Sequence, residues 1–531
     1  MVARRALLTA GLSALGVALA TAGLPQLVYP PWFDQGAFAA CGQILNRGGV
    51  FLRDCWDVRG PLTPMLYAFA LRFSESSHVV FMLNLVWQAA SAGLLGVLSW
   101  RITHSRAATL TGPVLYWLMH ATLNYWSVAQ AEGFANLAFI TAAWCAWEGR
   151  QLRHRAPGWW LAAGLCSGAL FWFKYPFAAF ALLLMLWTTL TVRQRPALRS
   201  ALGSLVAGWV VAIVAGGLYF VANQAGEALI VHLRYALANF HGKPLDERWE
   251  WLSSLFWVEL TTFARIGSTP TAGFKDTIPQ GLWLGRGFPL IVALVGLGAV
   301  RTLVNARLRA AGGLALLWLL GGVLLNIWQG HSYRYHFVIW LPPMALVAGL
   351  TTAGWQGWTG RAWQAATLSL AGLAAVAQYA AILPWMQDAA YQVLIAQRTL
   401  RHIHIESKQE ARVLLAEFLA DKLTPDQRVA IFSDTPEVHL LAQRSSATRF
   451  PYVRWADESR DPSVREWLAR AYLADLQRTK PAFFILTRDG FPWAEARFIE
   501  TWKALPEVAA FVESNYTYIG ENGPYLLFAQ R

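Results

Sequence analysis

The chain has 531 residues, of which 56% are hydrophobic and only 14% are charged. A soluble globular protein carries about 25% charged residues, so this composition excludes a soluble protein over most of the chain. The formal net charge is +13, but the excess of Lys and Arg lies before residue 385, and the tail after it is nearly neutral. The positive charge therefore belongs to the apolar region, and no nucleic-acid partner is expected.

The apolar residues are grouped in stretches, most of which reach the ~17–25 residues that cross a bilayer as a helix. They lie at residues 6–28, 78–100, 107–123, 128–147, 158–173, 175–192, 200–222, 287–305, 310–328, 335–354 and 362–384. The first stretch also resembles a cleavable signal peptide, but it runs on to Val28, which favours a retained membrane helix. We therefore predict a polytopic α-helical membrane protein with about eleven transmembrane helices.

Basic residues are concentrated in the short loops of one side, which the positive-inside pattern assigns to the cytoplasm. An odd number of spans then places residues 385–531 outside, which in a bacterium is the periplasm. We predict a transmembrane domain over residues 1–384, with outer loops 29–77 and 223–286, and a small periplasmic α/β domain over 385–531. The expected location is the bacterial inner membrane.

Periodicity predicts the elements of the outer regions. A helix is expected from Asp34, as its N-cap, to Asn46, and an interfacial helix from Trp249 to Arg265. The tail is predicted to contain helices at 407–422 and 463–479 and short buried strands at 428–432, 482–486 and 525–529.

Four cysteines leave their pairing open. Cys41 and Cys55 share one outer loop, where a disulfide is compatible with an oxidising compartment, but the sequence does not show whether they are close enough to bond. Cys145 and Cys166 fall in predicted spans and are interpreted as small apolar packing residues.

Ionisable residues gather at the outer ends of the predicted spans. Asp34 follows the first span at the expected membrane surface, where a carboxylate can either accept a proton or merely cap a helix. Glu132 lies at the outer end of the fourth span, and ionisable groups there are by default functional candidates. Several cations and polar neighbours accompany them, and they suit a phosphate at headgroup depth: Lys174, His331, Arg334, Tyr335 and His336.

Several short motifs together resemble a known family. They are Asp34 itself, Gly49–Asp54, Arg59–Leu62, Gln130–Glu132, Phe173–Lys174, His331–Pro343 and, in the tail, Phe432–Arg449. The pattern resembles the membrane glycosyltransferases of the C superfamily (GT-C). It is closest to the bacterial enzymes that include protein O-mannosyltransferases and the lipid A aminoarabinose transferase.

The resemblance implies roles for individual residues. Asp34 would be the catalytic base, and Glu132 would orient the acceptor or a metal. Arg59 would contact the phosphate of a lipid-linked donor, assisted by Lys174, Arg334 and His336. The remaining members of the pattern would support these groups: Asp54, Asp57, Tyr335 and His331. A divalent metal on Asp34, Asp57 or Glu132 stays open, and no other cofactor is implied.

The implied reaction is an inverting sugar transfer from a polyprenyl-phosphate-linked donor to a hydroxyl of a glycan, lipid or protein acceptor. Two departures from the family pattern matter. Gln35 stands where many protein mannosyltransferases have Glu, and Arg59 stands where the aminoarabinose transferases have Lys. The alternatives are a polymerase of lipid-linked saccharides and a flippase or transporter. A transporter predicts charged residues deep within spans and broken helices near the midplane.

Overall fold

The computed structural model describes residues 15–152, 156–239, 246–247, 285–329, 333–354, 357–405, 409–492 and 496–531. The start of the first predicted span, the predicted helix from Trp249 to Arg265 and His331 lie outside these residues. The chain divides into two compact units. Unit 1 comprises Met1–Tyr29, Phe81–Ile213 and Lys243–Thr399, and unit 2 comprises Pro30–Val80, Val214–Gly242 and Leu400–Arg531.

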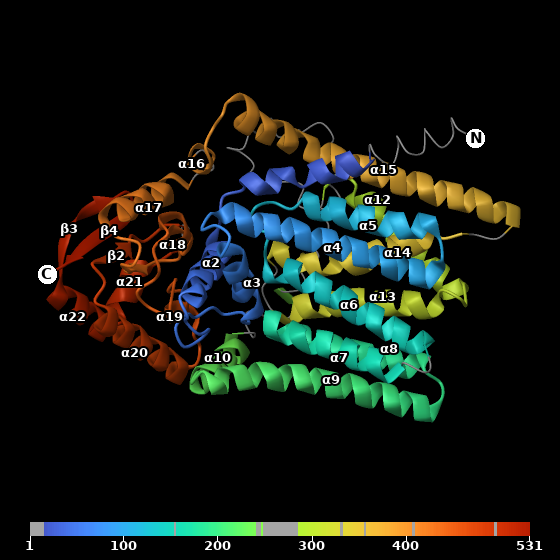
Figure 1. Cartoon of the computed structure of the whole chain (residues 1–531), viewed down its shortest axis with the longest axis horizontal. Helices are drawn as coiled ribbons and strands as arrows, with labels where there is room; N and C mark the ends of the chain where they lie inside the picture. Colours follow the sequence, from blue (N-terminus) through green and yellow to red (C-terminus); the bar gives the residue numbers. More distant parts are fainter. Residues whose placement is uncertain are drawn as a thin grey trace. The chain divides into compact units, whose positions relative to one another are not determined.

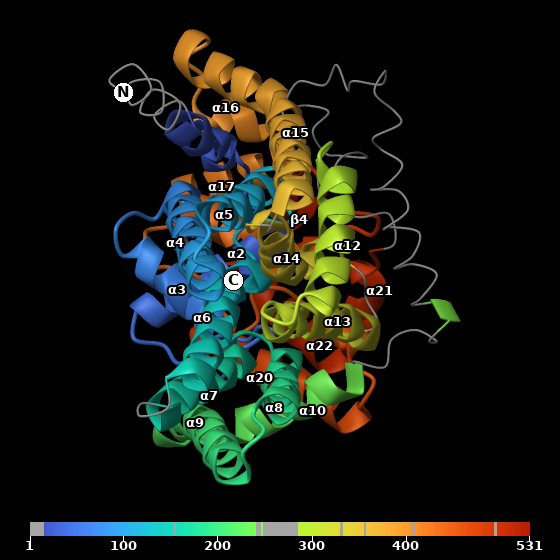
Figure 2. The ribbon, with the colours of Figure 1, turned by 90° about the vertical axis from the view of Figure 1, so that its right-hand side faces the viewer.

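Unit 1 is a bundle of helices, many of which run side by side (Figures 1 and 2). Each predicted span overlaps one or more of them. The helices, including two that extend into unit 2, are η1 (Leu24–Val28), α4 (Ser77–Thr103), α5 (Arg106–Ala121), α6 (Ala131–Gln151), α7 (Ala156–Phe173), η3 (Tyr175–Ala178), α8 (Ala179–Thr191), α9 (Arg195–Ala222), α12 (Phe288–Val304), α13 (Arg309–Gln329), η5 (Arg334–Trp340), α14 (Leu341–Thr352), α15 (Gly357–Ala390) and η6 (Tyr391–Ile395).

Several of these helices are long and apolar enough to cross a membrane. Five segments qualify in the described residues: Ser77–Thr103, Arg195–Ala222, Arg309–Gln329, Tyr335–Thr352 and Gly360–Ile395. Shorter apolar helices occupy Leu15–Val28, Tyr175–Thr191 and Phe288–Val304. Only 17% of the apolar window of α9 is buried within the protein, so most of its apolar surface must face lipid. The chain is therefore a multi-pass membrane protein.

Unit 2 combines the first outer loop with the tail. Its helices are α2 (Phe33–Asn46), α3 (Leu62–Leu71), α10 (Gly226–Asn239), α16 (Leu400–His404), α17 (Glu410–Lys422), α18 (Glu437–Ala442), α19 (Trp455–Glu458), α20 (Pro462–Thr479), α21 (Phe498–Lys503) and α22 (Pro506–Asn515). Its strands are β1 (Val429–Phe432), β2 (Phe483–Thr487), β3 (Tyr516–Asn522) and β4 (Tyr525–Gln530).

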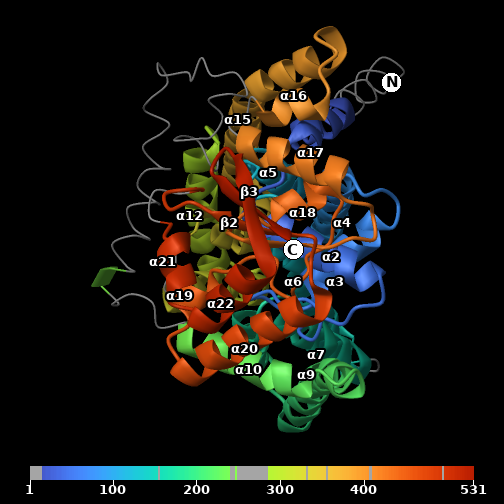
Figure 3. The ribbon, with the colours of Figure 1, turned by 90° about the vertical axis from the view of Figure 1, so that its left-hand side faces the viewer.

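The four strands form one mixed sheet in the order β1-β2-β4-β3 (Figure 3). β1 and β2 are parallel, with Val429 opposite Phe483, and β4 is antiparallel to both β2 and β3. The three predicted strands and the two predicted tail helices are confirmed within one to three residues. β3 was not predicted.

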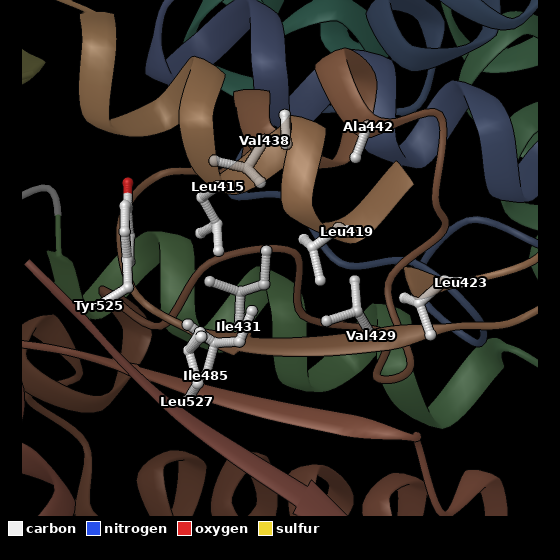
Figure 4. Close-up of a cluster of buried hydrophobic side chains, with 11 residues drawn as sticks. Leu415, Leu419, Leu423, Val429, Ile431, Val438, Ala442, Ile485, Tyr525 and Leu527 are labelled. Atoms are coloured by element: carbon white, nitrogen blue, oxygen red, sulfur yellow. The ribbon is translucent and has the colours of Figure 1, made fainter. Parts of the chain in front are cut away.

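The core of the tail lies between this sheet and the helices α17 and α18 (Figure 4). Leu415 and Leu419, one helical turn apart on α17, are fully buried against Ile431 and Ile485 of the sheet. The spacing of four residues places both leucines on one face of the helix. This core supports an α/β fold in the tail.

The first outer loop is tied by a disulfide between Cys41 of α2 and Cys55, whose Cα atoms lie 5.3 Å apart. α2 begins at Phe33, as predicted within one residue, but its N-cap is Trp32 and not Asp34. The backbone N–H of Trp32 donates to the side chain of Gln35 at 3.0 Å, which leaves the Asp34 carboxylate available for other contacts.

Candidate functional site

The first charged cluster lies in unit 2 and joins Asp34, Asp57 and Arg59. The Arg59 guanidinium pairs with Asp34 Oδ1 through Nη2, while its Nη1 lies 3.3 Å from Asp57 Oδ2. The backbone N–H of Arg59 also donates to Asp57 Oδ1 at 2.9 Å. The three side chains are almost fully buried, with 9%, 0% and 8% of their surface exposed. The sequence placed Asp34 at a superficial position, and the structure corrects this expectation.

Two buried carboxylates thus share one guanidinium. Burial raises the pKa of Asp57, Arg59 opposes this rise, and the neighbouring Asp34 carboxylate adds to it. The Arg59 guanidinium also lies over the ring of Phe38, 4.8 Å from its centroid. These contacts hold Arg59 in one place, with a formal charge of −1 over the cluster when both carboxylates are ionised.

Asp34 uses only one of its carboxylate oxygens in these contacts. Oδ1 accepts from Arg59, and Oδ2 makes no hydrogen bond to any residue that the structure describes. An ionised carboxylate has about four acceptor positions, so Oδ2 is able to take a hydrogen bond or a proton from a bound hydroxyl.

The second charged cluster lies in unit 1 and joins Glu132, Lys174 and His336. Lys174 Nζ lies 2.7 Å from Glu132 Oε1 and 3.0 Å from His336 Nε2. Because an ammonium group only donates, His336 Nε2 accepts and its proton lies on Nδ1. Glu132 Oε2 is buried and has no hydrogen-bond partner among the described residues. Glu132 therefore repeats the arrangement of Asp34, with one oxygen on a cation and the other open.

The backbone around this cluster is fixed by one buried amide side chain, that of Asn136. Asn136 lies one turn after Glu132 on α6, and its Nδ2 donates to the carbonyl of Val338 at 3.2 Å. The same amide donates to the hydroxyl of Tyr116, also at 3.2 Å. Since Val338 follows His336 by two residues, Asn136 links the two elements that carry Glu132 and His336. Sequence analysis did not identify Asn136, although a polar residue inside a span was a signal for it.

Aromatic rings surround Lys174. Its Nζ lies 6.0 Å from the ring centroid of Tyr335 and 5.9 Å from that of Phe177. Tyr335 stacks on Tyr333 with centroids 5.6 Å apart. Of the other predicted members, Arg334 opens η5, but its side chain and the whole of His331 are outside the described residues.

Asp54 lies in neither cluster. Its Oδ2 accepts from the side chain of Arg53 and from the backbone N–H of Val50 at 2.8 Å, so it closes a turn of the first loop. This contact gives it a structural role.

A metal site is not built by these carboxylates within the described part of the chain. No three His, Cys, Asp or Glu side chains there lie close enough together to hold an ion. Asp34 and Asp57 are bridged by Arg59, and Glu132 is paired with Lys174. A guanidinium or ammonium group already occupies the place where a divalent cation would bind, so the residues present do not fit one.

Two residues at the first cluster were not identified from the sequence. The hydroxyl of Tyr452 lies 3.4 Å from Asp57 Oδ2, and His232 Nε2 lies 2.6 Å from the Asp57 carbonyl oxygen. Burial lowers the pKa of His232 to about 4, so this imidazole is neutral and donates through Nε2. Both residues come from segments far from Asp57 in the chain, and no local pattern marks them.

The whole chain is similar in fold to solved structures of known proteins. No protein-family model and no curated protein sequence matches it. The crystal structure of ArnT from Cupriavidus metallidurans bound to undecaprenyl phosphate aligns over 98% of both chains, with a TM-score of 0.57 and 13% identity. Its apo structure also aligns over 98% of both chains, with a TM-score of 0.59 and 14% identity. The chain therefore has the fold of ArnT from Cupriavidus metallidurans.

Proposed function

We propose that this protein is an inverting glycosyltransferase that uses a polyprenyl-phosphate-linked sugar. The acceptor would be a hydroxyl of a glycan, a lipid or a protein on the periplasmic face of the bacterial inner membrane. The observation that carries the proposal is the buried Asp34 carboxylate, which has one oxygen on Arg59 and the other open, in a chain with the ArnT fold. A base beside a fixed cation is what a displacement at a sugar phosphate requires.

The proposed reaction is a single displacement at the anomeric carbon. The acceptor hydroxyl gives its proton to Asp34 Oδ2 as its oxygen forms a bond to the anomeric carbon. The bond between that carbon and the phosphate oxygen breaks, and polyprenyl phosphate leaves with the electron pair. Because attack and departure occur on opposite sides, the anomeric centre inverts. No step needs a metal.

Arg59 would neutralise the leaving phosphate, and its bidentate fork suits two phosphate oxygens. The phosphate would then compete with Asp34 for the guanidinium, which Asp57 continues to hold in place. A carboxylate freed from its cation accepts a proton more readily, so donor binding and activation of the base are coupled. Lys174, Arg334 and His336 are proposed to assist at the phosphate, and Glu132 to orient the acceptor through its open oxygen.

The proposed location is supported by the disulfide between Cys41 and Cys55, because disulfides persist in the periplasm and not in the cytosol. We therefore propose that unit 2, with the tail, lies on the periplasmic side of the inner membrane. No observation favours a transporter or a polymerase over the transferase.

The test is sugar transfer in liposomes by the wild type and Asp34→Asn, each given a panel of radiolabelled polyprenyl phosphate sugars and envelope extract. We expect label to reach an acceptor with the wild type and transfer to fall at least about a hundredfold in the variant. Asparagine keeps the shape and leaves Arg59 paired with Asp57, so the fold should survive, which thermal unfolding checks. Near-normal turnover by a folded Asp34→Asn protein would refute the assignment of the base.

A further inference from the structure

The Asp57 carboxylate is fixed by a residue of the tail as well as by its own loop. Asp57 is fully buried, and its Oδ2 has two neighbours, Arg59 Nη1 at 3.3 Å and the hydroxyl of Tyr452 at 3.4 Å. The same hydroxyl accepts from the backbone N–H of Val58 at 3.2 Å. One hydroxyl, which can donate once and accept twice, therefore binds both the carboxylate and the backbone just before Arg59.

The ring of Tyr452 contacts the other side of the cluster. It packs edge-on against Phe33, with centroids 5.0 Å apart, and Phe33 immediately precedes Asp34 on α2. Tyr452 is only 2% exposed, so its position is set by packing. The side chain of Tyr452 therefore contacts both Phe33, which precedes Asp34, and Val58, which precedes Arg59.

The tail also holds the backbone just before this contact. The N–H of Trp56 donates to the carbonyl of Arg449 at 2.6 Å. Arg449 is itself fixed by Asp475 of α20, with its Nε and Nη2 at 2.9 and 3.1 Å from the two carboxylate oxygens. The segment at residues 56–58 is therefore attached to the tail at two points, Arg449 and Tyr452.

The helix that carries Asp34 is held in the same way. Gln409 Nε2 donates to the carbonyl of Pro31 at 3.0 Å, and the guanidinium of Arg412 lies 4.5 Å from the ring centroid of Trp32. At Gly36, an added Cβ would lie 2.3 Å from the backbone nitrogen of Glu437, so α2 and α18 touch backbone to backbone. The tail therefore contacts residues on both sides of Asp34 in the sequence, Pro31 and Trp32 before it and Gly36 after it.

We propose that Tyr452 is a positioning residue of the donor site, which acts through Asp57 to hold Arg59 where it binds the phosphate of a lipid-linked substrate. The tail is then part of the catalytic apparatus, because it supplies Tyr452. The inference rests on the proposed function, since it takes Arg59 as the phosphate ligand.

The test compares Tyr452→Phe with Tyr472→Phe. Tyr472 is a fully buried tyrosine of the same tail, packed against Phe432, Phe450 and Trp455, and its hydroxyl has no hydrogen-bond partner among the described residues. Both variants lose one buried hydroxyl, but only the first loses a contact with Asp57. We measure binding of undecaprenyl phosphate to the full-length protein in detergent, the KM values for donor and acceptor, and thermal unfolding.

We expect Tyr452→Phe to weaken binding of undecaprenyl phosphate and to raise the donor KM by about tenfold, because a hydrogen bond to a charged group is lost. The acceptor KM should stay within about twofold, and Tyr472→Phe should match the wild type in all three constants. A role in folding alone would reduce the active fraction without changing the donor KM. A Tyr452→Phe protein with wild-type affinity for the lipid phosphate would overturn the proposal.

A second variant keeps the proposal testable if Tyr452→Phe is poorly folded. Asp57→Asn should by itself weaken lipid phosphate binding, and adding Tyr452→Phe to it should cause little further loss, because the tyrosine acts through that carboxylate. Fully additive losses would show that Tyr452 acts otherwise. If the wild type fails to bind undecaprenyl phosphate at all, the proposed function falls and this inference falls with it. Normal wild-type binding with no effect at Tyr452 refutes this inference alone.

Discussion

At the scale of single residues, the predicted catalytic groups are paired and not free. Arg59 bridges Asp34 and Asp57, and Lys174 pairs with Glu132. The sequence predicted that carboxylates and cations gather on one membrane face, because their positions relative to the spans are readable from it. It did not predict which charge pairs with which. Burial makes such pairing obligatory, since an isolated buried charge costs several kcal/mol.

A buried ion pair of the tail gives a prediction about pH. Glu437 of α18 pairs with Arg412 of α17, and both side chains are almost fully buried. Burial raises the pKa of Glu437 to about 7, although Arg412 opposes the rise. Between the ordinary value of 4.5 and 7, the folded protein keeps a proton that the unfolded chain has lost. The contribution of Glu437 to stability is therefore largest below pH 4.5 and declines as the pH rises to 7.

Glu437→Gln cannot titrate, so it lacks this dependence. We expect the unfolding free energy of the wild type, relative to that of the variant, to decrease by at most about 3 kcal/mol from pH 4.5 to 7. Thermal unfolding of the two proteins across this range measures the difference. The loss of the partner of Arg412 adds an offset that is the same at each pH. Curves that stay parallel would show that Glu437 titrates normally in the folded protein.

At the scale of elements, periodicity predicted most helices because burial or lipid contact imposes it. The helices α17 and α20 and the strands β1, β2 and β4 followed from apolar spacing. β3 did not, because it is an edge strand and six of its seven residues are at least partly exposed without regular alternation. The N-cap of α2 was also predicted wrongly. A tryptophan cap that uses Gln35 has no characteristic sequence pattern, whereas Asp34 matched the usual preference for a carboxylate.

Close packing of α7 on α9 depends on glycines. A Cβ at Gly164 would lie 2.1 Å from the carbonyl oxygen of Leu205, and one at Gly208 would lie 2.2 Å from that of Leu161. These neighbours are backbone atoms and cannot turn aside. We expect Gly164→Ala to destabilise the protein by about 1–3 kcal/mol, because the helices must separate.

The matched control is Gly203→Ala on α9, where an added Cβ meets nothing within 4 Å. This substitution should leave stability unchanged or raise it by up to about 1 kcal/mol, since alanine favours a helix over glycine. Thermal unfolding in detergent compares the two variants. Equal unfolding midpoints would show that α7 and α9 are not held together by contact at Gly164.

At the scale of the whole molecule, the membrane topology decides whether unit 2 lies on the periplasmic or the cytoplasmic side of the membrane. The sequence predicted the sidedness from the basic short loops, and the disulfide of the first loop agrees with an oxidising compartment. The fold itself was predictable because lipid allows only helices or closed barrels to span it. The attachment of the first loop to the tail was not, because its contacts join residues hundreds of positions apart.

Single introduced cysteines test the topology without disturbing either unit. Asp421 at the end of α17 has 73% of its side chain exposed, and Arg307 is exposed in the short loop between α12 and α13. A membrane-impermeant maleimide added to spheroplasts should label Asp421→Cys and leave Arg307→Cys unlabelled until the membrane is opened. Both variants also carry Cys166→Ser, because Cys166 is a free, half-buried thiol. The other native cysteines give a low background, because Cys41 and Cys55 are bonded and Cys145 is buried. The reverse labelling would put unit 2 in the cytoplasm, where a periplasmic transferase could not reach its acceptor.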